Sequence, residues 1–347
     1  MLDRTLTVRV SRKRRLTAEV TAFELVHPWG RTLPAYEAGA HIDVWLPGGF
    51  MRQYSLARAA DVSADPAARG GCTRYVIGVK REPAGRGGSA SLHDRVHEGD
   101  LLAIGTPRNA FPLHPAAQHH LLLAGGIGLT PLLAMAEQLD REHRAFTLCV
   151  FARSRAHLPF ADALAALGPR VRLHLDEPAG AEGGHPAQHL DIPALLRQPG
   201  PGTHLYLCGP AGFMQAVLAA AAHWPEERVH LEYFAPPADA AGAAHDEPFT
   251  LVVAGRGLVV PVAADQSAVD ALHDLGIEVP TSCAQGVCGT CVVPLARDPA
   301  APVGSAVAPG GEPEHRDHCL SATERRAKVA LCCSRARAGG RLVVEIP

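Results

Sequence analysis

The chain of 347 residues has little excess charge of either sign and no long uninterrupted apolar run. Its formal net charge is -2, which excludes the strongly basic surface typical of nucleic-acid or membrane-surface binding. The richest apolar stretch, residues 121–136, is broken by three glycines and a proline and is too short to span a bilayer. The charged N-terminal residues are not followed by an apolar segment of the secretory kind. We therefore expect a cytoplasmic protein that contacts neither nucleic acid nor membrane.

The nine cysteines are odd in number, and their grouping argues against a disulfide framework. Cys283, Cys288 and Cys291 lie so close in sequence that disulfide loops between them would be short and strained. Their C-x4-C-x2-C order is that of plant-type 2Fe-2S ligation. Gly286 and Gly289 let the backbone curl and direct N–H groups at sulfur, which stabilises a negatively charged cluster. The spacing predicts a 2Fe-2S cluster; a zinc site or inert buried thiols are the alternatives.

Spacing alone does not choose the fourth ligand among Cys319, Cys332 and Cys333. The tail of the chain resembles the C-terminus of the phthalate dioxygenase reductase and vanillate demethylase reductase family, in the segments Gly311–Asp317, Cys332–Arg335 and Arg341–Ile346. In that family the ligand stands two places before a Ser-Arg pair, which implies Cys332 here. Residues 296–310, rich in Pro, Ala and Gly, are an insertion that we expect to form a surface loop, because lengthening a loop adds little entropy cost.

Short alternating segments, rich in β-branched residues and separated by Gly and Pro, occupy the N-terminal part of the chain. Such segments at near-regular spacing predict a closed or nearly closed antiparallel β-barrel over residues 1–115. The expected strands are Leu6–Val10, Val20–Val26, His41–Leu46, Arg74–Lys80 and Leu101–Ile104.

Two segments of this barrel, Leu33–Val44 and Arg52–Leu56, resemble the flavin domain of the same reductase family. There the Arg-x-Tyr-Ser element runs along the flavin, and the chemistry agrees, because an arginine fork suits a phosphate. A third family segment, Val79–Ser89, leads a strand through a glycine loop into an expected helix with Ser89 as its cap, and implies that the cofactor is FMN rather than FAD. The implied flavin contacts are Arg52, Gln53, Tyr54, Ser55, Val79, Lys80, Gly87, Gly88 and Ser89.

From residue 116 to 236 apolar strands alternate with helices, which predicts an α/β domain with a parallel sheet. The strand His120–Ala124 leads into a Gly-Gly-x-Gly-x-Thr-Pro turn and then a helix to about Leu139. We expect Thr130 to cap this helix and Pro131 to begin it, so that a pyrophosphate meets free amides. The turn resembles that of ferredoxin-reductase-like nicotinamide domains, which implies nucleotide contacts from Gly125, Gly126, Gly128, Thr130 and Pro131.

The next strand, Phe146–Phe151, is followed by Arg153, Ser154 and Arg155, with no acidic residue. In a nucleotide-binding sheet this strand end faces the adenosine ribose, where an acid favours a free 2′-hydroxyl and an arginine accommodates a 2′-phosphate. These residues therefore do not exclude NADPH as the dinucleotide substrate. The family resemblance implies NADH, which we expect to be the better substrate, with Arg153 and Ser154 near the ribose.

The strand Thr203–Leu207 delivers Cys208, Gly209 and Pro210 before a helix at Ala211–His223. In the family this loop lies beside the nicotinamide. A free cysteine at a strand end is more often a packing residue than a nucleophile, so we expect Cys208 to position the ring together with Ser55. The segment His230–Phe234 resembles the family element that closes the domain, which implies catalytic roles for Glu232 and for Phe234 as the aromatic cover of the flavin.

Residues 237–247 have the composition of a linker. Beyond them, Phe249–Val253 and Leu258–Val262 predict a hairpin, and Ala268–Leu275 predicts a helix before the cysteine segment. This pattern predicts a small α+β ferredoxin-like domain of the β-grasp type over residues 248–347.

The predicted fold is thus multidomain, with a flavin barrel, a nicotinamide domain and a ferredoxin domain in that order. Nicotinamide gives up two electrons as a hydride and an iron-sulfur centre accepts one at a time, so a flavin is needed between them. The resemblance implies an NADH-dependent reductase for a Rieske-type non-haem iron oxygenase. A stand-alone diaphorase or ferric reductase would not need the ferredoxin domain, and a non-catalytic redox sensor would not need two nucleotide sites.

Overall fold

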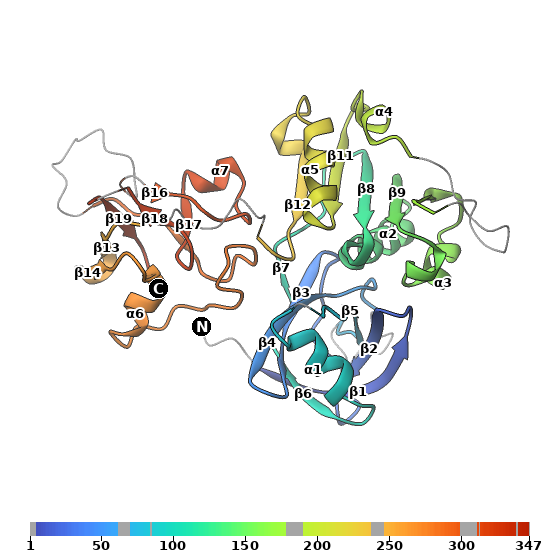
Figure 1. The fold of residues 1–347 in the computed structure, drawn as a ribbon, viewed down its shortest axis with the longest axis horizontal. Helices are drawn as coiled ribbons and strands as arrows, with labels where there is room; N and C mark the ends of the chain where they lie inside the picture. The colour runs from blue at the N-terminus through green and yellow to red at the C-terminus, as the bar shows by residue number, and fades with distance from the viewer. Residues whose placement is uncertain are drawn as a thin grey trace. The chain divides into compact units, whose positions relative to one another are not determined.

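The computed structural model divides the chain into two compact units, Met1–Glu232 and Tyr233–Pro347 (Figure 1). Most of the predicted linker, residues 237–245, and most of the predicted inserted loop, residues 299–310, lie outside the described residues. None of the described helices combines the length and the apolar character needed to cross a bilayer. The structure describes residues 5–61, 70–83, 85–177, 190–236, 246–298, 311, 313–337 and 339–346.

An antiparallel barrel forms the N-terminal part of the larger unit. Its strand order is β4-β3-β6-β1-β2-β5, with β7 paired to β3, and an isolated bridge between Leu56 and Ile77 joins the end of β4 to β5. The predicted near-closed barrel is therefore confirmed. The strands are β1 (Leu6–Arg15), β2 (Val20–Val26), β3 (Ala40–Leu46), β4 (Phe50–Ser55), β5 (Tyr75–Lys80), β6 (Leu101–Ile104) and β7 (Arg108–Asn109), and the helix that follows β5 is α1 (Gly88–Arg95).

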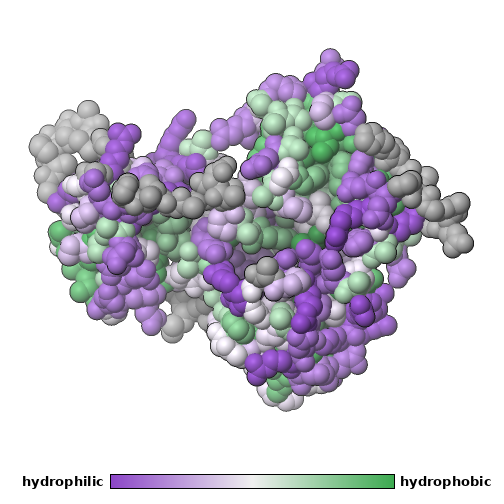
Figure 2. Space-filling view, viewed as in Figure 1, coloured by the Kyte–Doolittle hydropathy of each residue, from purple (hydrophilic) through white to green (hydrophobic). Residues whose placement is uncertain are grey.

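Strand β1 is longer than predicted and includes the basic residues Arg12–Arg15. The Lys13 ammonium donates to the carbonyl oxygens of His93 and Val96, 2.7 Å from each, at the C-terminal end of α1. A cation there satisfies carbonyls that the helix leaves open. In the view of Figure 2, hydrophilic side chains cover much of the barrel end of the larger unit.

A five-stranded parallel sheet forms the rest of the larger unit, in the order β10-β9-β8-β11-β12. Because all five strands point the same way, their carboxyl ends share one edge. Helix α2 packs against β8, β9 and β11. The elements are β8 (His119–Gly125), α2 (Leu129–Arg141), β9 (Phe146–Ala152), α3 (Ala161–Ala166), β10 (Val171–Leu175), α4 (Ile192–Leu196), β11 (Thr203–Cys208), α5 (Ala211–Ala220) and β12 (Val229–Glu232), with 3-10 turns at Gly126–Gly128 (η2), Arg155–His157 (η3), Gly168–Arg170 (η4) and Glu226–Arg228 (η5).

Two predicted helix caps are wrong. Helix α2 begins at Leu129 with Gly128 as its N-cap, because the 3-10 turn η2 runs directly into it; Pro131 is the third helical residue, and the Thr130 hydroxyl donates to the Ile127 carbonyl at 3.0 Å. Helix α1 begins at Gly88, and its N-cap Gly87 has a φ of 83°. Glycine suits that left-handed position because it has no Cβ. The Ser89 hydroxyl instead accepts the N–H of Glu82 at 3.0 Å.

The smaller unit contains a three-stranded mixed sheet, β14-β13-β19, two two-stranded sheets, β15-β17 and β16-β18, and short helices, which confirms the predicted α+β class. The hairpin of β13 and β14 has the predicted bounds, and β19 adds to β13 in parallel. The Asp246 carboxylate binds Arg316 at 2.8 and 3.0 Å, so the last residues of the predicted linker belong to this unit. The elements are β13 (Phe249–Val253), β14 (Leu258–Val262), α6 (Ala268–His273), β15 (Val292–Pro294), β16 (Pro313–Glu314), α7 (Ala322–Arg325), β17 (Lys328–Ala330), β18 (Arg335–Ala336) and β19 (Arg341–Val344), with a 3-10 turn, η7, at Ala254–Arg256.

Candidate functional site

Four thiols meet in the smaller unit. Cys283 contacts Cys288 and Cys332, and Cys291 contacts Cys332. The pairing of β15 with β17 explains this convergence, because Val292 lies opposite Ala330 and so places Cys291 beside the turn that carries Cys332. The two segments are 41 residues apart in the chain.

Backbone donors surround these sulfur atoms. Amide N–H groups donate to Cys283 Sγ from Gln285 at 3.3 Å, to Cys288 Sγ from Thr290 at 3.4 Å, and to Cys291 Sγ from Cys332 at 3.4 Å. Gly286 and Gly289, with φ near 70°, provide the tight curl between the ligands. Four convergent thiols with amide donors are the ligand set that a plant-type 2Fe-2S cluster requires, so the residues fit that group.

The other two cysteines of this region are Cys333, whose side chain also contacts Cys332, and Cys319. Cys333 Sγ lies under the cysteine loop, since a methyl group at Gly286 would come within 2.6 Å of it. Cys319 Sγ faces the buried carboxylate of Asp317 at 4.0 Å, and burial raises the pKa of Cys319 to about 12. All nine cysteines are free thiols. Cys319 thus lies outside the group of four, whereas Cys332 contacts two of its members.

Arg335, of the Ser-Arg pair in the tail, has a structural role. Arg335 is buried and donates to the carbonyl oxygens of Glu247, Ala263 and Gln266 at 2.9 to 3.0 Å, and its guanidinium lies 4.9 Å from the ring centroid of Phe249. These bonds fix the strand that follows the turn of Cys332.

The first part of the flavin element lies against the start of α1. The Arg52 guanidinium donates to the carbonyl oxygens of Met51 at 2.8 Å and Arg86 at 3.2 Å, and a methyl group at Gly88 would lie 2.7 Å from Arg52 Cγ and Nε. A cation beside the free amides of an eight-residue helix provides the charge and donors that bind a phosphate. The fold therefore brings together two segments that the sequence separates by about 35 residues.

Phe50, which the sequence analysis did not select, supports this arrangement. Its ring lies 5.5 Å from the Arg52 guanidinium and would meet a methyl group at Gly87 at 2.9 Å. No local pattern distinguishes this phenylalanine from an ordinary strand residue, because its contact with Gly87 involves a distant segment of the chain.

The remaining predicted flavin residues lie on β4 and β5. Gln53 Nε2 is 3.5 Å from His41 Nε2, and burial raises the pKa of Tyr54. Val79 is buried with its carbonyl oxygen 2.9 Å from His93 Nε2. The ammonium of Lys80 is paired with Glu82 at 3.2 Å. The ends of β4 and β5 thus lie beside the loop that precedes α1.

The second part of the flavin element meets the carboxyl edge of the parallel sheet. Ser55 is buried at the end of β4, and its hydroxyl donates to Glu232 Oε2 at 3.1 Å. Glu232 is the last residue of β12 and pairs in register with Cys208 of β11. Burial raises the pKa of Glu232 to about 7, although the hydrogen bond from Ser55 lowers it. This contact joins the barrel element to two strand ends of the nucleotide sheet.

Cys208 is fully buried, and burial, followed by the charge of Glu232, raises the pKa of its thiol well above the usual range. The thiol is therefore protonated at neutral pH and is a poor nucleophile. This agrees with the expected packing position.

The glycine turn after β8 packs directly on the backbone of Cys208. A methyl group at Gly128 would lie 2.2 Å from the Cys208 carbonyl oxygen, and one at Gly125 would meet Phe213 at 2.8 Å and Pro210 at 3.0 Å. Gly126, with a φ of 53°, has open space where a Cβ would stand. The turn and the Cys208–Pro210 loop therefore form one closely packed edge.

The residues predicted at the ribose follow β9. Arg153 binds the carboxylate of Glu19, and the Ser154 hydroxyl lies 2.8 Å from His157 Nδ1. The aromatic residue predicted to cover the flavin, Phe234, is 44% exposed and belongs to the smaller unit. Its predicted role stays a prediction.

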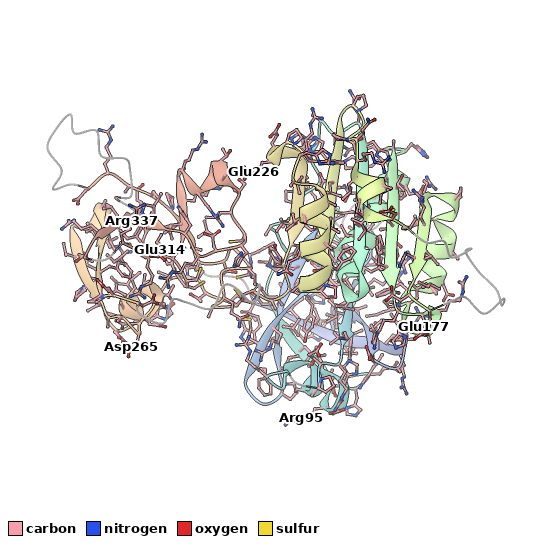
Figure 3. All side chains as sticks on the ribbon, turned by 45° about the horizontal axis from the view of Figure 1, so that its top comes forward. Arg95, Glu177, Glu226, Asp265, Glu314 and Arg337 are labelled. Carbon is pink, nitrogen blue, oxygen red and sulfur yellow. The ribbon has the colours of Figure 1, made fainter. Side chains whose placement is uncertain are left out.

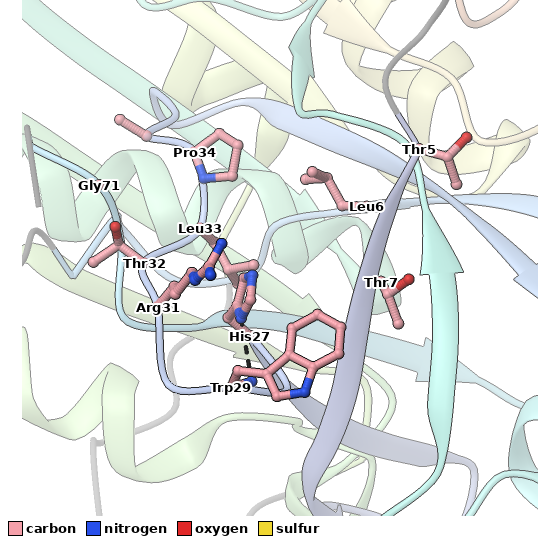
Figure 4. A pocket seen from close by; sticks show the side chains of 11 residues that line it. Thr5, Leu6, Thr7, His27, Trp29, Arg31, Thr32, Leu33, Pro34 and Gly71 are labelled. Carbon is pink, nitrogen blue, oxygen red and sulfur yellow. Dashed lines mark hydrogen bonds between the residues drawn. The ribbon is translucent and has the colours of Figure 1, made fainter.

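A separate pocket of about 540 Å³ opens on the barrel between the start of β1 and the residues after β2 (Figure 4). Its lining includes His27, Trp29, Arg31 and Thr32 and contains none of the predicted site residues. The Trp29 amide donates to His27 Nδ1 at 3.2 Å.

Comparison with known proteins is consistent with this geometry. The 2Fe-2S iron-sulfur cluster binding domain matches residues 251–337. The tert-butanol monooxygenase / tert-amyl alcohol desaturase reductase subunit of Aquincola tertiaricarbonis is 43% identical over 338 residues, covering 94% of this chain and 92% of that protein. The vanillate O-demethylase oxidoreductase of Pseudomonas sp. (strain HR199 / DSM 7063) is 39% identical over 334 residues, covering 94% and 96%.

Among solved structures, phthalate dioxygenase reductase, described as a modular structure for electron transfer from pyridine nucleotides to 2Fe-2S, has a TM-score of 0.65 and 34% identity. The match covers 99% of this chain and 98% of that one. The chain therefore belongs to the phthalate dioxygenase reductase and vanillate O-demethylase reductase family, the oxidoreductases that act as reductase components of oxygenase systems.

Proposed function

We propose that this chain passes electrons from NADH, through FMN and a 2Fe-2S cluster, to a Rieske-type oxygenase component in the cytoplasm. The observation that best supports the flavin and nucleotide steps is the hydrogen bond between Ser55 and Glu232, because it joins the flavin element to the carboxyl edge of the nucleotide sheet. When bound, FMN accepts two electrons at once and releases them singly.

Different segments of the chain would bind different parts of the two cofactors. Arg52 and the amides of Gly87–Ser89 would hold the flavin phosphate, and Ser55 would fix the edge of the ring. The turn of Gly125–Gly128 would bind the dinucleotide pyrophosphate with backbone amides. Cys208 would act as a positioning residue, because it is buried and protonated.

Three further assignments belong to this proposal. Cys283, Cys288, Cys291 and Cys332 would ligate the cluster. Phe234 would cover the flavin. The functional domains would span residues 1–115, 116–236 and 248–347.

Anaerobic titration of the purified protein with NADH tests the function. We expect both the flavin and the cluster absorbance to bleach, and the reduced protein then to reduce a Rieske oxygenase component faster than a haem protein acceptor. Bleaching of the flavin alone would favour a stand-alone diaphorase, and bleaching of neither would contradict the proposal.

The cofactor itself provides a second test. Because Arg52 and the start of α1 would form one phosphate site, heat release followed by chromatography should yield FMN. Recovery of FAD would contradict this prediction.

Glu232 should make hydride transfer pH-dependent. Above its pKa of about 7 the Glu232 carboxylate accepts a hydrogen bond from the Ser55 hydroxyl, whereas the protonated carboxyl leaves Ser55 free to donate to the flavin edge. The rate constant for flavin reduction by NADH, measured by anaerobic stopped flow, should therefore rise as the pH falls from about 8 to about 6.

The variant Glu232→Gln should flatten this profile. Glu226→Gln, in the 3-10 turn η5 that precedes β12 (Figure 3), is the matched control and should keep it. If the rate constant for flavin reduction keeps the same inflection with pH in Glu232→Gln, a group other than Glu232 titrates.

A further inference from the structure

No acidic residue follows β9 in the sequence, but a carboxylate from the barrel, that of Glu19, lies beside Arg153 at the end of this strand. Arg153 Nη2 lies 3.0 Å from both Oε1 and Oε2 of Glu19. Glu19 is in the turn between β1 and β2, 134 residues earlier in the chain. The two side chains are 58% and 39% exposed, so the pair remains accessible to a ligand.

The backbones of both partners are held in place. The Glu19 carbonyl accepts the N–H of Arg81 at 2.7 Å, and its amide donates to the Thr17 hydroxyl at 3.2 Å. The Arg153 carbonyl accepts the N–H of Glu177 at 2.9 Å, at the end of β10 (Figure 3). The pair is therefore set by the fold rather than by two mobile loops.

The charges favour an ionised carboxylate at this position. The hydrogen bond from Arg153 lowers the pKa of Glu19, and the nearby charges of Lys80 and His157 act in the same direction. An arginine that already binds a carboxylate has less positive charge to offer a phosphate.

The location of the Glu19–Arg153 pair at the end of β9 indicates what it would contact. Strand β9 neighbours β8, whose glycine turn begins the nucleotide site, and the carboxyl end of that neighbouring strand faces the adenosine ribose in such sheets. We propose that Glu19 determines dinucleotide specificity by occupying Arg153 and presenting a carboxylate to the ribose, which admits a free 2′-hydroxyl and disfavours a 2′-phosphate. This inference rests on the proposed NADH-dependent function.

A carboxylate at this position reconciles two expectations from sequence about the dinucleotide. The residues after β9 left NADPH open, whereas the family resemblance implied NADH. A carboxylate contributed by the barrel gives this strand end the negative charge that its own sequence lacks.

A double-mutant cycle tests the pair, with kcat/KM measured for NADH and NADPH using ferricyanide as the acceptor. The wild type should prefer NADH. Glu19→Gln should raise the NADPH-to-NADH ratio of kcat/KM by about tenfold, because it frees the Arg153 charge. Starting from Arg153→Gln, the same change should raise the ratio by a clearly smaller factor, because only the repulsion between the Glu19 carboxylate and a 2′-phosphate is then removed.

Asp162→Asn is the matched control, because it removes another ion pair of the barrel, that of Arg14 with Asp162 of helix α3 at 3.5 Å, without changing Glu19 or Arg153. Its ratio should equal that of the wild type. An unchanged ratio in Glu19→Gln, an equal rise in Asp162→Asn, or an undiminished rise in the Arg153→Gln background would each overturn the inference. A wild type reduced by neither nucleotide would instead contradict the proposed function.

Discussion

Cys332→Ser should lose most of the 2Fe-2S absorbance while its flavin remains reducible by NADH. The change removes a soft thiolate from the four that converge in the smaller unit, and cluster binding depends on thiolate ligation. The flavin and nucleotide elements lie in the other unit and should be unaffected. Ferricyanide reduction directly from the flavin should persist, whereas cytochrome c reduction should fall by a large factor, at least about tenfold.

Cys333→Ser and Cys319→Ser are the matched controls. Cys333 Sγ packs under Gly286, and Cys319 faces Asp317. Both variants should keep the cluster spectrum, because neither removes one of the four proposed ligands. A normal cluster in Cys332→Ser together with its loss in either control would overturn the ligand assignment without affecting the family assignment.

Gly128→Ala should lower kcat/KM for NADH by about a hundredfold or more, because small displacements of a binding turn have effects of this size. The added methyl group would lie 2.2 Å from the carbonyl oxygen of Cys208 and 2.4 Å from its carbonyl carbon. Both atoms belong to the backbone of β11, which is hydrogen-bonded on both sides and cannot move aside. The glycine turn must shift instead and move its amides away from the pyrophosphate.

Gly212→Ala is the control for this change. Gly212 lies in the first turn of α5, on the same edge of the sheet, and a methyl group there would have nothing within 4 Å. This variant should retain wild-type kinetics. Flavin content, measured from absorbance, should be normal in both proteins, since the flavin elements lie on the barrel. Wild-type kinetics in Gly128→Ala would show that the turn does not bind the dinucleotide.

The sequence by itself was sufficient wherever the determining contacts are local. The hairpin of Phe249–Val253 with Leu258–Val262 has its predicted bounds, because alternating β-branched residues around glycine specify a hairpin without distant help. The C-x4-C-x2-C spacing likewise placed three thiols together, and the change from short strands to a strand-helix pattern after residue 115 identified the parallel sheet. The tail identified the family, which the comparisons confirm.

The tertiary structure decided what depends on neighbours from distant segments. Thr130 and Ser89 have the composition of helix caps, but a 3-10 turn preceding one helix and the backbone of Glu82 beside the other gave their hydroxyls different partners. Ser55 and Glu232 are hydrogen-bonded although they are 177 residues apart in the sequence, and no local pattern encodes this contact. Glu19 is the clearest case: the acid missing from the end of β9 comes from a barrel turn, because the spatial neighbours of a strand end are set by how the barrel packs on the sheet and not by the residues that follow the strand.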